Sequence, residues 1–208
     1  RDSNHTPLIV VDQIIKDHPS DTIILDNQRA SYEPVKKLIS LGHTKIAIIT
    51  GGIDHYTSQQ RLNGYEKALR ECHLPIYKHY IQCGNYSTEG GYEAMMKLAK
   101  LPDPPTAVFI SNYDMEIGAY IAINNLNLKI PEDISLIGFD NLPLVNIVNP
   151  PLSFSEQPTD EMGLAAAKLL YRRMQGDQSD YPKTLIHAPI FHYTDSICSP
   201  LDKERVRL

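Results

Sequence analysis

The chain is patterned as short apolar runs separated by longer segments of mixed polarity. The runs are rich in Val and Ile, and turn residues bound each of them: PLIVVD (7–12), DTIILD (21–26), KIAIITG (45–51), TAVFISN (106–112) and ISLIGFD (134–140). Continuous apolar runs of this length are typical of strands that are buried on both faces. We therefore expect each run to form a buried strand.

Segments with helical spacing of apolar residues lie between or after these runs. They cover residues 32–42, 60–72, 88–100, 115–127 and 159–176. The last is the clearest, because Thr159 and Glu161 suit a helix N-terminus and Gly176 suits the end. Strands that alternate with helices predict an α/β fold with a mostly parallel, doubly wound sheet.

Small polar side chains follow nearly every predicted strand. In open parallel sheets, ligands bind beyond the carboxyl ends of the strands. Carboxylates accept hydrogen bonds and amides both donate and accept them, so such groups suit a ligand with many hydroxyls. The residues are Asp12, Asp26 and Asn27, Thr50 to Gly52, Ser111 and Asn112, and Asp140 and Asn141.

Capping of the next helix is the alternative role for each of these residues taken singly. We expect Asp26 and Asn27 to be caps, since a helix follows them directly. The whole set is better explained by one shared edge that binds a polar small molecule.

Composition and charge exclude several classes of protein. The 208 residues carry a net charge of −5, and Lys and Arg are scattered, so this chain alone is a poor binder of the nucleic-acid backbone. Three cysteines without metal-site spacing indicate neither a disulfide framework nor a zinc site, and they favour a reducing cytoplasm. No apolar run approaches the roughly 18 residues of a membrane span, and no signal peptide is visible.

Motifs of catalysis and of cofactor binding are missing from the sequence. Gly51 and Gly52 lack the third glycine of a dinucleotide loop, and neither a phosphate loop nor a Gly-x-Ser-x-Gly elbow occurs. The eight histidines are dispersed, and none pairs at metal spacing on a helix. We predict no catalytic residue, no cofactor and no metal site.

Five motifs follow one another in register from about residue 7 to residue 198. They are LGHTKIAIITGG (41–52), RLNGY (61–65) with Ala68 and Leu69, PPTAVFISN (104–112), IPEDISLIGFDN (130–141), and NPPLSFSEQP (149–158) followed by AAAKLL (165–170). In this order and spacing the chain resembles the regulatory domain of the LacI/GalR family of bacterial transcription repressors.

The resemblance implies the fold of periplasmic sugar-binding proteins. Two doubly wound α/β subdomains would be joined by three crossovers, and the effector would lie in the cleft between them. We expect residues 1–43 and 156–187 to form the amino-side subdomain. Residues 44–155 and 188–208 would form the carboxyl-side subdomain.

The resemblance also implies roles for matching residues. Arg61 corresponds to an arginine that reaches the hydroxyls or carboxylate of the effector, and Asp140 to an aspartate that accepts from ligand donors. Tyr86 falls where the family often places a stacking ring, although packing under a loop is an equal alternative. An ion pair with Asp140 is the alternative for Arg61. The full set of predicted effector-binding residues is Thr57, Arg61, Tyr86, Asn112, Asp140 and Gln157.

The chain departs from the family pattern in several places. The family usually has Asn-Asp after the TAVF strand, where this chain has Asn112-Tyr113-Asp114, and it often has Arg where this chain has Thr194. Family members also begin with a helix-turn-helix and a hinge helix, and their regulatory domain has further elements before PLIVVD. We therefore expect a longer protein with its DNA-contacting part upstream of Arg1, and an incomplete amino-side subdomain with an unpaired sheet edge.

The function that the resemblance implies is that of an effector-sensing domain. A sugar, sugar phosphate or nucleoside would bridge both subdomains of a cytoplasmic homodimer and control operator binding. The run LPLVNIV (142–148) is predicted to lie in the dimer contact, with internal packing as the alternative. Two other functions stay open: a periplasmic sugar-binding protein of a transporter, and an enzyme on a doubly wound fold, for which no catalytic constellation is visible.

Overall fold

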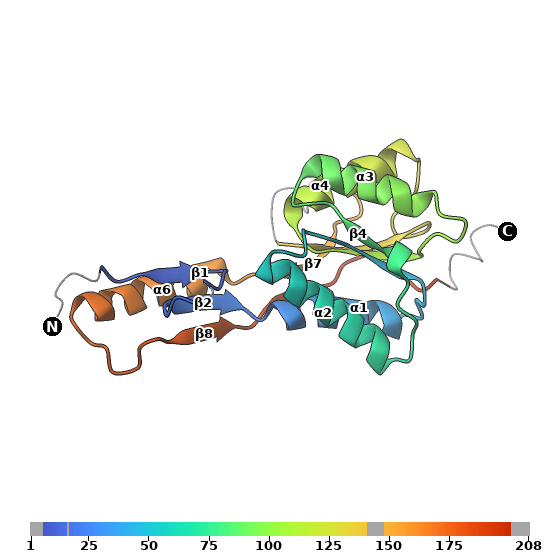
Figure 1. The fold of residues 1–208 in the computed structure, drawn as a ribbon. Coiled ribbons are helices and arrows are strands. Elements are labelled where there is room, and N and C mark those ends of the chain that lie inside the picture. Colours follow the sequence, from blue (N-terminus) through green and yellow to red (C-terminus); the bar gives the residue numbers. More distant parts are fainter. Residues whose placement is uncertain (1–5, 16, 141–147, 201–208) are drawn as a thin grey trace.

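Two separate β-sheets organise the molecule, which is described here from a computed structural model covering residues 6–15, 17–140 and 148–200. A three-stranded sheet has the order β1-β2-β8, and a six-stranded sheet has the order β4-β3-β5-β6-β7-β9. Figure 1 shows the resulting elongated shape, with the small sheet in one lobe and the large sheet in the other. We call these the amino-side lobe and the carboxyl-side lobe.

The amino-side lobe is small. Its parallel strands are β1 (Ile9–Val11), β2 (Asp21–Leu25) and β8 (Thr184–His187). Helix α6 (Thr159–Met174) packs on this sheet, and Met162 and Leu169 of the helix contact Ile23 in a small apolar core. The strand register brings residues more than 150 positions apart side by side, since Thr22 pairs with Thr184.

A buried ion pair lies at the far end of the amino-side lobe. Arg173 donates from Nε and Nη2 to the two carboxylate oxygens of Asp21, at 2.7 and 3.0 Å, and both side chains are almost inaccessible. Burial by itself would raise the pKa of Asp21, but hydrogen bonds from Arg173 and from the backbone of Lys183 lower it. This pair joins β2 to the end of α6.

The carboxyl-side lobe holds the larger core. Five parallel strands are β3 (Ile46–Thr50), β4 (Ile81–Cys83), β5 (Ala107–Ile110), β6 (Ser135–Phe139) and β7 (Ser153–Glu156), and β9 (Ile190–His192) pairs with β7 in the antiparallel sense. Every residue of β3, β5 and β6 is buried, as expected for strands covered on both faces.

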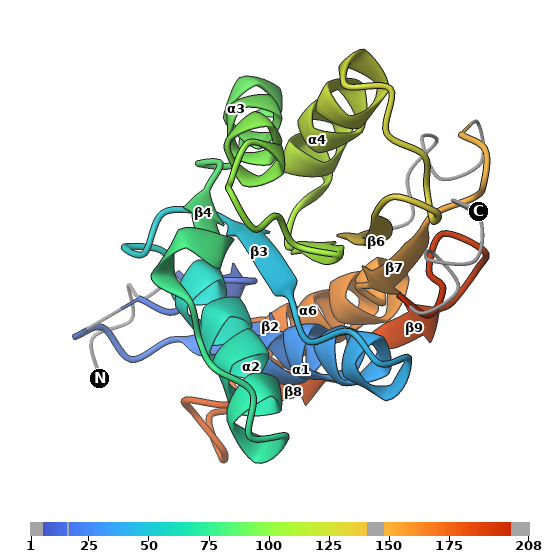
Figure 2. The same ribbon diagram turned by 90° about the vertical axis from the view of Figure 1, so that its right-hand side faces the viewer.

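Helices cover both faces of the large sheet, as Figure 2 shows. Helices α1 (Asn27–Ser40) and α2 (Tyr56–Glu71) form one apolar layer, and α3 (Thr88–Ala99) and α4 (Tyr113–Asn125) form the other. A short 3-10 helix, Lys78–Tyr80, precedes β4. This arrangement confirms the predicted doubly wound parallel sheets.

Glycine allows close contacts between the paired helices of this lobe. A Cβ at Gly64 of α2 would lie 2.1 Å from the carbonyl oxygen of Gln28 in α1. A Cβ at Gly118 of α4 would lie 1.8 Å from the carbonyl oxygen of Thr88 in α3. The glycine of the RLNGY motif is therefore required by the packing of α1 against α2.

The five predicted strands and five predicted helices are all present, but the helices α1 and α2 begin several residues earlier than expected. Strands β4, β7, β8 and β9 were not predicted. Each is only three or four residues long, and none is a continuous apolar run of the kind used to find the others. In β7, for example, the buried Ser153 makes hydrogen bonds to Ser196 and Thr194 instead of apolar contacts that a continuous run would signal.

Three crossovers connect the two sheets in the described part of the chain, after β2, β7 and β8. We had expected residues up to 43 to belong to the amino-side subdomain, but α1 packs on the large sheet. Its buried Val35 and Leu38 share a core with Ile46 and Tyr65. The chain therefore passes between the sheets at Asp26, because the apolar face of α1 fits α2. No described helix is both long and apolar enough to cross a membrane.

Candidate functional site

The carboxyl ends of strands from both sheets meet where the two lobes join, and five polar residues gather there. Asp12 follows β1, Asn27 begins α1 after β2, Arg61 lies on α2, Asp140 follows β6, and Gln157 follows β7. We call these five residues the strand-end cluster. Two of its members, Asn27 and Gln157, lie on the crossovers between the lobes.

Arg61 is the centre of the strand-end cluster, with only 4% of its surface exposed. Its Nε donates to Oδ1 of Asn27 at 2.8 Å, and Nη1 donates to the carbonyl oxygen of Ser111. Its Cζ lies 3.7 Å from the centre of the Phe139 ring. Burial lowers the pKa of Arg61, and the charges of Asp12 and Asp140 oppose this. The direct ion pair with Asp140 that we considered is replaced by these contacts to Asn27 and Ser111.

Asp140 is held by backbone and side-chain contacts at the end of β6. Its N–H donates to the carbonyl oxygen of Ser155 at 2.7 Å, and its carboxylate accepts from Nε2 of Gln157 at 3.1 and 3.2 Å. Its φ of 73° is a left-handed conformation that Asp and Asn tolerate better than most residues. Burial raises the pKa of Asp140, whereas Gln157 and the charge of Arg61 lower it.

Two members of the cluster were not among the predicted site residues. Asn27, which we expected to be a cap, instead accepts from Arg61 and donates to the carbonyl oxygen of Leu25 at 3.3 Å. Asp26 is the cap, as expected, because its Oδ1 accepts from the N–H of Arg29 at 3.0 Å. Asp12 was recognised as a polar strand end, but no family motif marked it. Burial raises its pKa, while Arg61 and Asn27 oppose the shift.

Thr57 and Tyr86 lie together, one helical turn from Arg61. The Tyr86 hydroxyl makes hydrogen bonds with the hydroxyls of Thr57, at 2.8 Å, and Ser58, at 2.5 Å. Its ring lies so close to Gly51 that a Cβ there would be 2.1 Å from a ring carbon. In this structure the ring therefore packs under its loop, which is the alternative that we left open for Tyr86.

Asn112 caps helix α4. Its Oδ1 accepts from the N–H of Met115 at 3.3 Å. The neighbouring carbonyl of Ser111 is the group that contacts Arg61. Capping is thus the observed role of the Asn112 oxygen, and contact with an effector stays a prediction.

Buried oxygens without a hydrogen-bond partner surround the cluster in the described part of the chain. Each ordinarily costs about 1–3 kcal/mol, so a native structure contains few of them. A ligand that donates hydroxyl protons would remove part of this cost. The atoms at or beside the strand ends are Oδ1 of Asp12, Oγ1 of Thr50, Oγ of Ser111, Oε1 of Glu116 and Oγ of Ser155.

Glu116 lies directly beneath the strand end that carries Asp140. It is fully buried, and its Oε2 accepts from the N–H of Phe139 at 3.2 Å. A Cβ at Gly138 would lie 2.1 Å from its carboxyl group, so the glycine makes room for this side chain. Burial, with a further contribution from the charge of Asp140, raises the pKa of Glu116 to about 8, although the N–H of Phe139 opposes the shift. The carboxyl group is therefore largely protonated at neutral pH.

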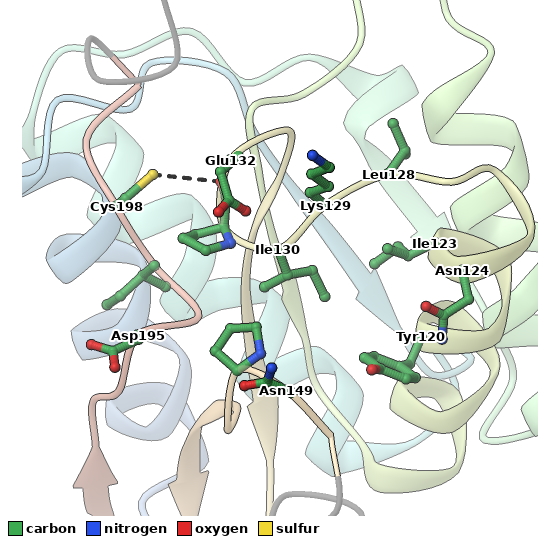
Figure 3. Close-up of a pocket in the computed structure, with 13 residues that line it drawn as sticks. Tyr120, Ile123, Asn124, Leu128, Lys129, Ile130, Glu132, Asn149, Asp195 and Cys198 are labelled. Carbon is green, nitrogen blue, oxygen red and sulfur yellow. Dashed lines mark hydrogen bonds between the residues drawn. The ribbon is translucent and has the colours of Figure 1, made fainter. Parts of the chain in front are cut away.

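Two cavities of the structure lie away from this cluster. One of about 690 Å³ is at the opposite edge of the large sheet, where Cys198 contacts the carbonyl oxygen of Pro131 (Figure 3). The other, of about 790 Å³, lies beside Asp21 and Arg173. None of the six predicted effector residues lines either cavity. Within the described residues, no group of three or more His, Cys, Asp or Glu side chains could hold a metal ion.

Known protein families and curated relatives were compared with this chain, and their matches agree with the fold described above. Residues 35–192 match the family model of the periplasmic binding protein-like domain. The probable HTH-type transcriptional repressor ExuR of Bacillus subtilis is 43% identical over 165 residues, which are 79% of this chain and 50% of the relative. The HTH-type transcriptional repressor CytR of Escherichia coli is 38% identical over 173 residues, 83% of this chain and 51% of the relative. The chain thus spans about half the length of these relatives.

A solved structure is also similar. The LacI family transcriptional regulator from Enterococcus faecium with bound ribose superimposes with a TM-score of 0.84 and 29% identity, over 93% of this chain and 71% of that one. The relatives are transcriptional repressors rather than enzymes. The chain belongs to the family of periplasmic binding protein-like domains, and its relatives place it with the effector domains of LacI-type transcriptional regulators.

Proposed function

We propose that this chain is the effector-sensing domain of a LacI-type transcriptional repressor and that its effector binds at the strand-end cluster. The supporting observation is one buried guanidinium at the junction of the lobes, together with buried oxygens that lack a hydrogen-bond partner at or beside the strand ends. Ordered donors and acceptors of this kind suit a small polar molecule such as a sugar. The ribose-bound regulator of the same fold supports the assignment.

The six predicted effector residues remain in the proposed site, and two residues are added to them. Arg61, Asp140 and Gln157 form the polar floor, together with Asp12 and Asn27, which the structure brings beside them. The remaining predicted residues, Thr57, Tyr86 and Asn112, form the adjoining rim on the carboxyl-side lobe.

The location of the cluster supports a mechanism of regulation. Asp12 belongs to one sheet, Asp140 to the other, and Asn27 and Gln157 to the connections. A ligand bound by all of these residues stabilises one relative orientation of the lobes. The difference between its binding free energies for two orientations is the free energy with which it can shift the equilibrium between them. We propose that this orientation governs operator binding by a helix-turn-helix (HTH) domain. The relatives ExuR and CytR are both named as HTH-type repressors.

The two repressors named above also favour this function over the alternatives. We propose that the protein is not an enzyme and acts in the cytoplasm. A periplasmic sugar-binding protein would share the fold but is not supported by these names. The cluster contains no serine, cysteine or histidine that could form a nucleophile and base pair of the usual kind.

We further propose a homodimer, since operator half-sites are read by symmetric dimers. Of the predicted dimer contact, residues 142–147 lie outside the described residues, and Val148 packs in the core of the carboxyl-side lobe. Light scattering at tens of micromolar protein should give twice the 23.5 kDa of one chain. A mass of one chain would contradict self-association.

Binding at the cluster can be tested through Asp140. In a thermal-shift screen of sugars and nucleosides, a true effector at a hundred times its dissociation constant should add about 2.7 kcal/mol of stability. Replacing Asp140→Asn keeps the shape and the left-handed backbone but removes the charge, and we expect affinity for that effector to fall roughly 10- to 100-fold by calorimetry.

The matched control is Glu93→Gln on the exposed surface of α3, which should bind with unchanged affinity. Undiminished binding by the Asp140→Asn variant would place the effector elsewhere in the molecule.

A further inference from the structure

The charges at the strand-end cluster are unbalanced. The carboxyl groups of Asp12 and Asp140 both interact with the charge of Arg61. Burial raises the pKa of each carboxyl group, and the charge of Arg61 lowers it. Among the described residues, two carboxyl groups, those of Asp12 and Asp140, therefore act on the single guanidinium of Arg61.

The guanidinium of Arg61 is also partly occupied. Nε donates to Asn27 and Nη1 donates to Ser111, and one face of the group covers the ring of Phe139. A carboxylate or phosphate is gripped best by two parallel N–H groups of one arginine. The edge formed by Nε and Nη2 cannot offer this grip, because Asn27 already accepts from Nε.

The remaining polar atoms mostly accept hydrogen bonds. Oδ1 of Asp12 has no partner, and the Asp140 carboxylate is bonded by the Gln157 amide. Hydroxyl groups can donate to both carboxylates and still accept from Arg61. An ionised carboxylate or phosphate group of a ligand offers mainly acceptor oxygens, and it would lie beside two carboxylates in a partly buried place where charge repulsion is strong.

We propose that the effector is an uncharged, hydroxyl-rich molecule, the ring of a free sugar or of a nucleoside, and that the site rejects anionic derivatives of the same molecule. The proposal rests on the proposed function, and it narrows the class of effector. The preference for a neutral ligand follows from the unpartnered Oδ1 of Asp12 and from the guanidinium of Arg61, whose Nε and Nη1 already donate hydrogen bonds within the protein.

Matched pairs of ligands test the preference directly. Calorimetry on the whole chain would compare ribose with ribose 5-phosphate, galactose with galacturonate, glucose with glucuronate, and cytidine and adenosine with their 5′-monophosphates. In the pair that contains the effector, we expect the neutral member to bind at least ~10-fold more tightly. The sugar pairs and the nucleoside pairs distinguish the two sources of the ring.

Replacing Asp12→Asn tests the cause of the preference. The amide keeps the shape of the side chain and removes one charge, so the gap between the neutral and anionic members should narrow several-fold. The Glu93→Gln variant, on the exposed surface of α3, should leave the gap unchanged.

Failure of this inference is distinct from failure of the proposed function. An anionic member that binds as tightly as its neutral partner, or a gap that Asp12→Asn does not alter, would overturn the preference and leave the sensing function intact. Absence of binding by every member of every pair would overturn both.

Discussion

Replacing Arg173→Met should lower the melting temperature of the protein by about 10 °C. Arg173 neutralises Asp21 in a place where both side chains are almost inaccessible, and it joins β2 to the end of α6. Methionine fills a similar volume but leaves the Asp21 carboxylate buried without its partner. Breaking one half of a buried pair is costly for this reason, even where the intact pair adds little stability. Differential scanning calorimetry at neutral pH gives the measurement.

The neighbouring Arg172 is a matched control. It is exposed to 38% and forms surface ion pairs with Asp177 and Asp180. Surface pairs contribute little, so Arg172→Met should shift the melting temperature by no more than about 3 °C. The double change Asp21→Asn with Arg173→Met should recover part of the loss, because the uncompensated charge is gone. Equal changes in melting temperature for the two arginine variants would show that breaking the buried pair costs no more than breaking a surface pair.

The second large effect concerns pH and Glu116. Its pKa of about 8 in the folded protein compares with an ordinary value of 4.5. Between these two values the folded state holds a proton that the unfolded state has lost, so the stability from this group is complete below pH 4.5 and falls as pH rises toward 8. The total loss is about 5 kcal/mol by linkage.

Glutamine at this position imitates the protonated carboxyl group and does not ionise. The Glu116→Gln variant should therefore resemble the parent protein near pH 5 and exceed it in free energy of unfolding by several kcal/mol near pH 9. Urea unfolding of both proteins across this range gives the comparison. A difference that stays constant from pH 5 to pH 9 would mean that Glu116 ionises normally.

Much of the fold was predictable because its signals are local. The five apolar runs became β1, β2, β3, β5 and β6, and all of them except β1 are buried along their whole length. The expectation of burial is wrong for β1, because it is an edge strand and leaves Val11 exposed. Short edge strands such as β4 and β9 carry no such signal. Their pairing partners supply the hydrogen bonds that define them, and those partners are distant in sequence.

The site was predictable only in part. Arg61 and Asp140 were expected together, and the structure brings them into one cluster. The cap Asp26 and the cluster residue Asn27 are adjacent, and both precede the same helix, so residue type could not separate their roles. Their different directions at the start of α1 send one side chain to Arg29 and the other to Arg61.

By itself, the sequence determined the doubly wound architecture, the family and the pair Arg61 and Asp140, because periodicity and motifs are local properties of the chain. Only the tertiary structure decided that α1 packs on the large sheet, that Asp12 and Asn27 join the cluster, and that Glu116 lies buried beneath Asp140. These outcomes depend on which surfaces meet across the fold, and on the burial and charge that each side chain finds there.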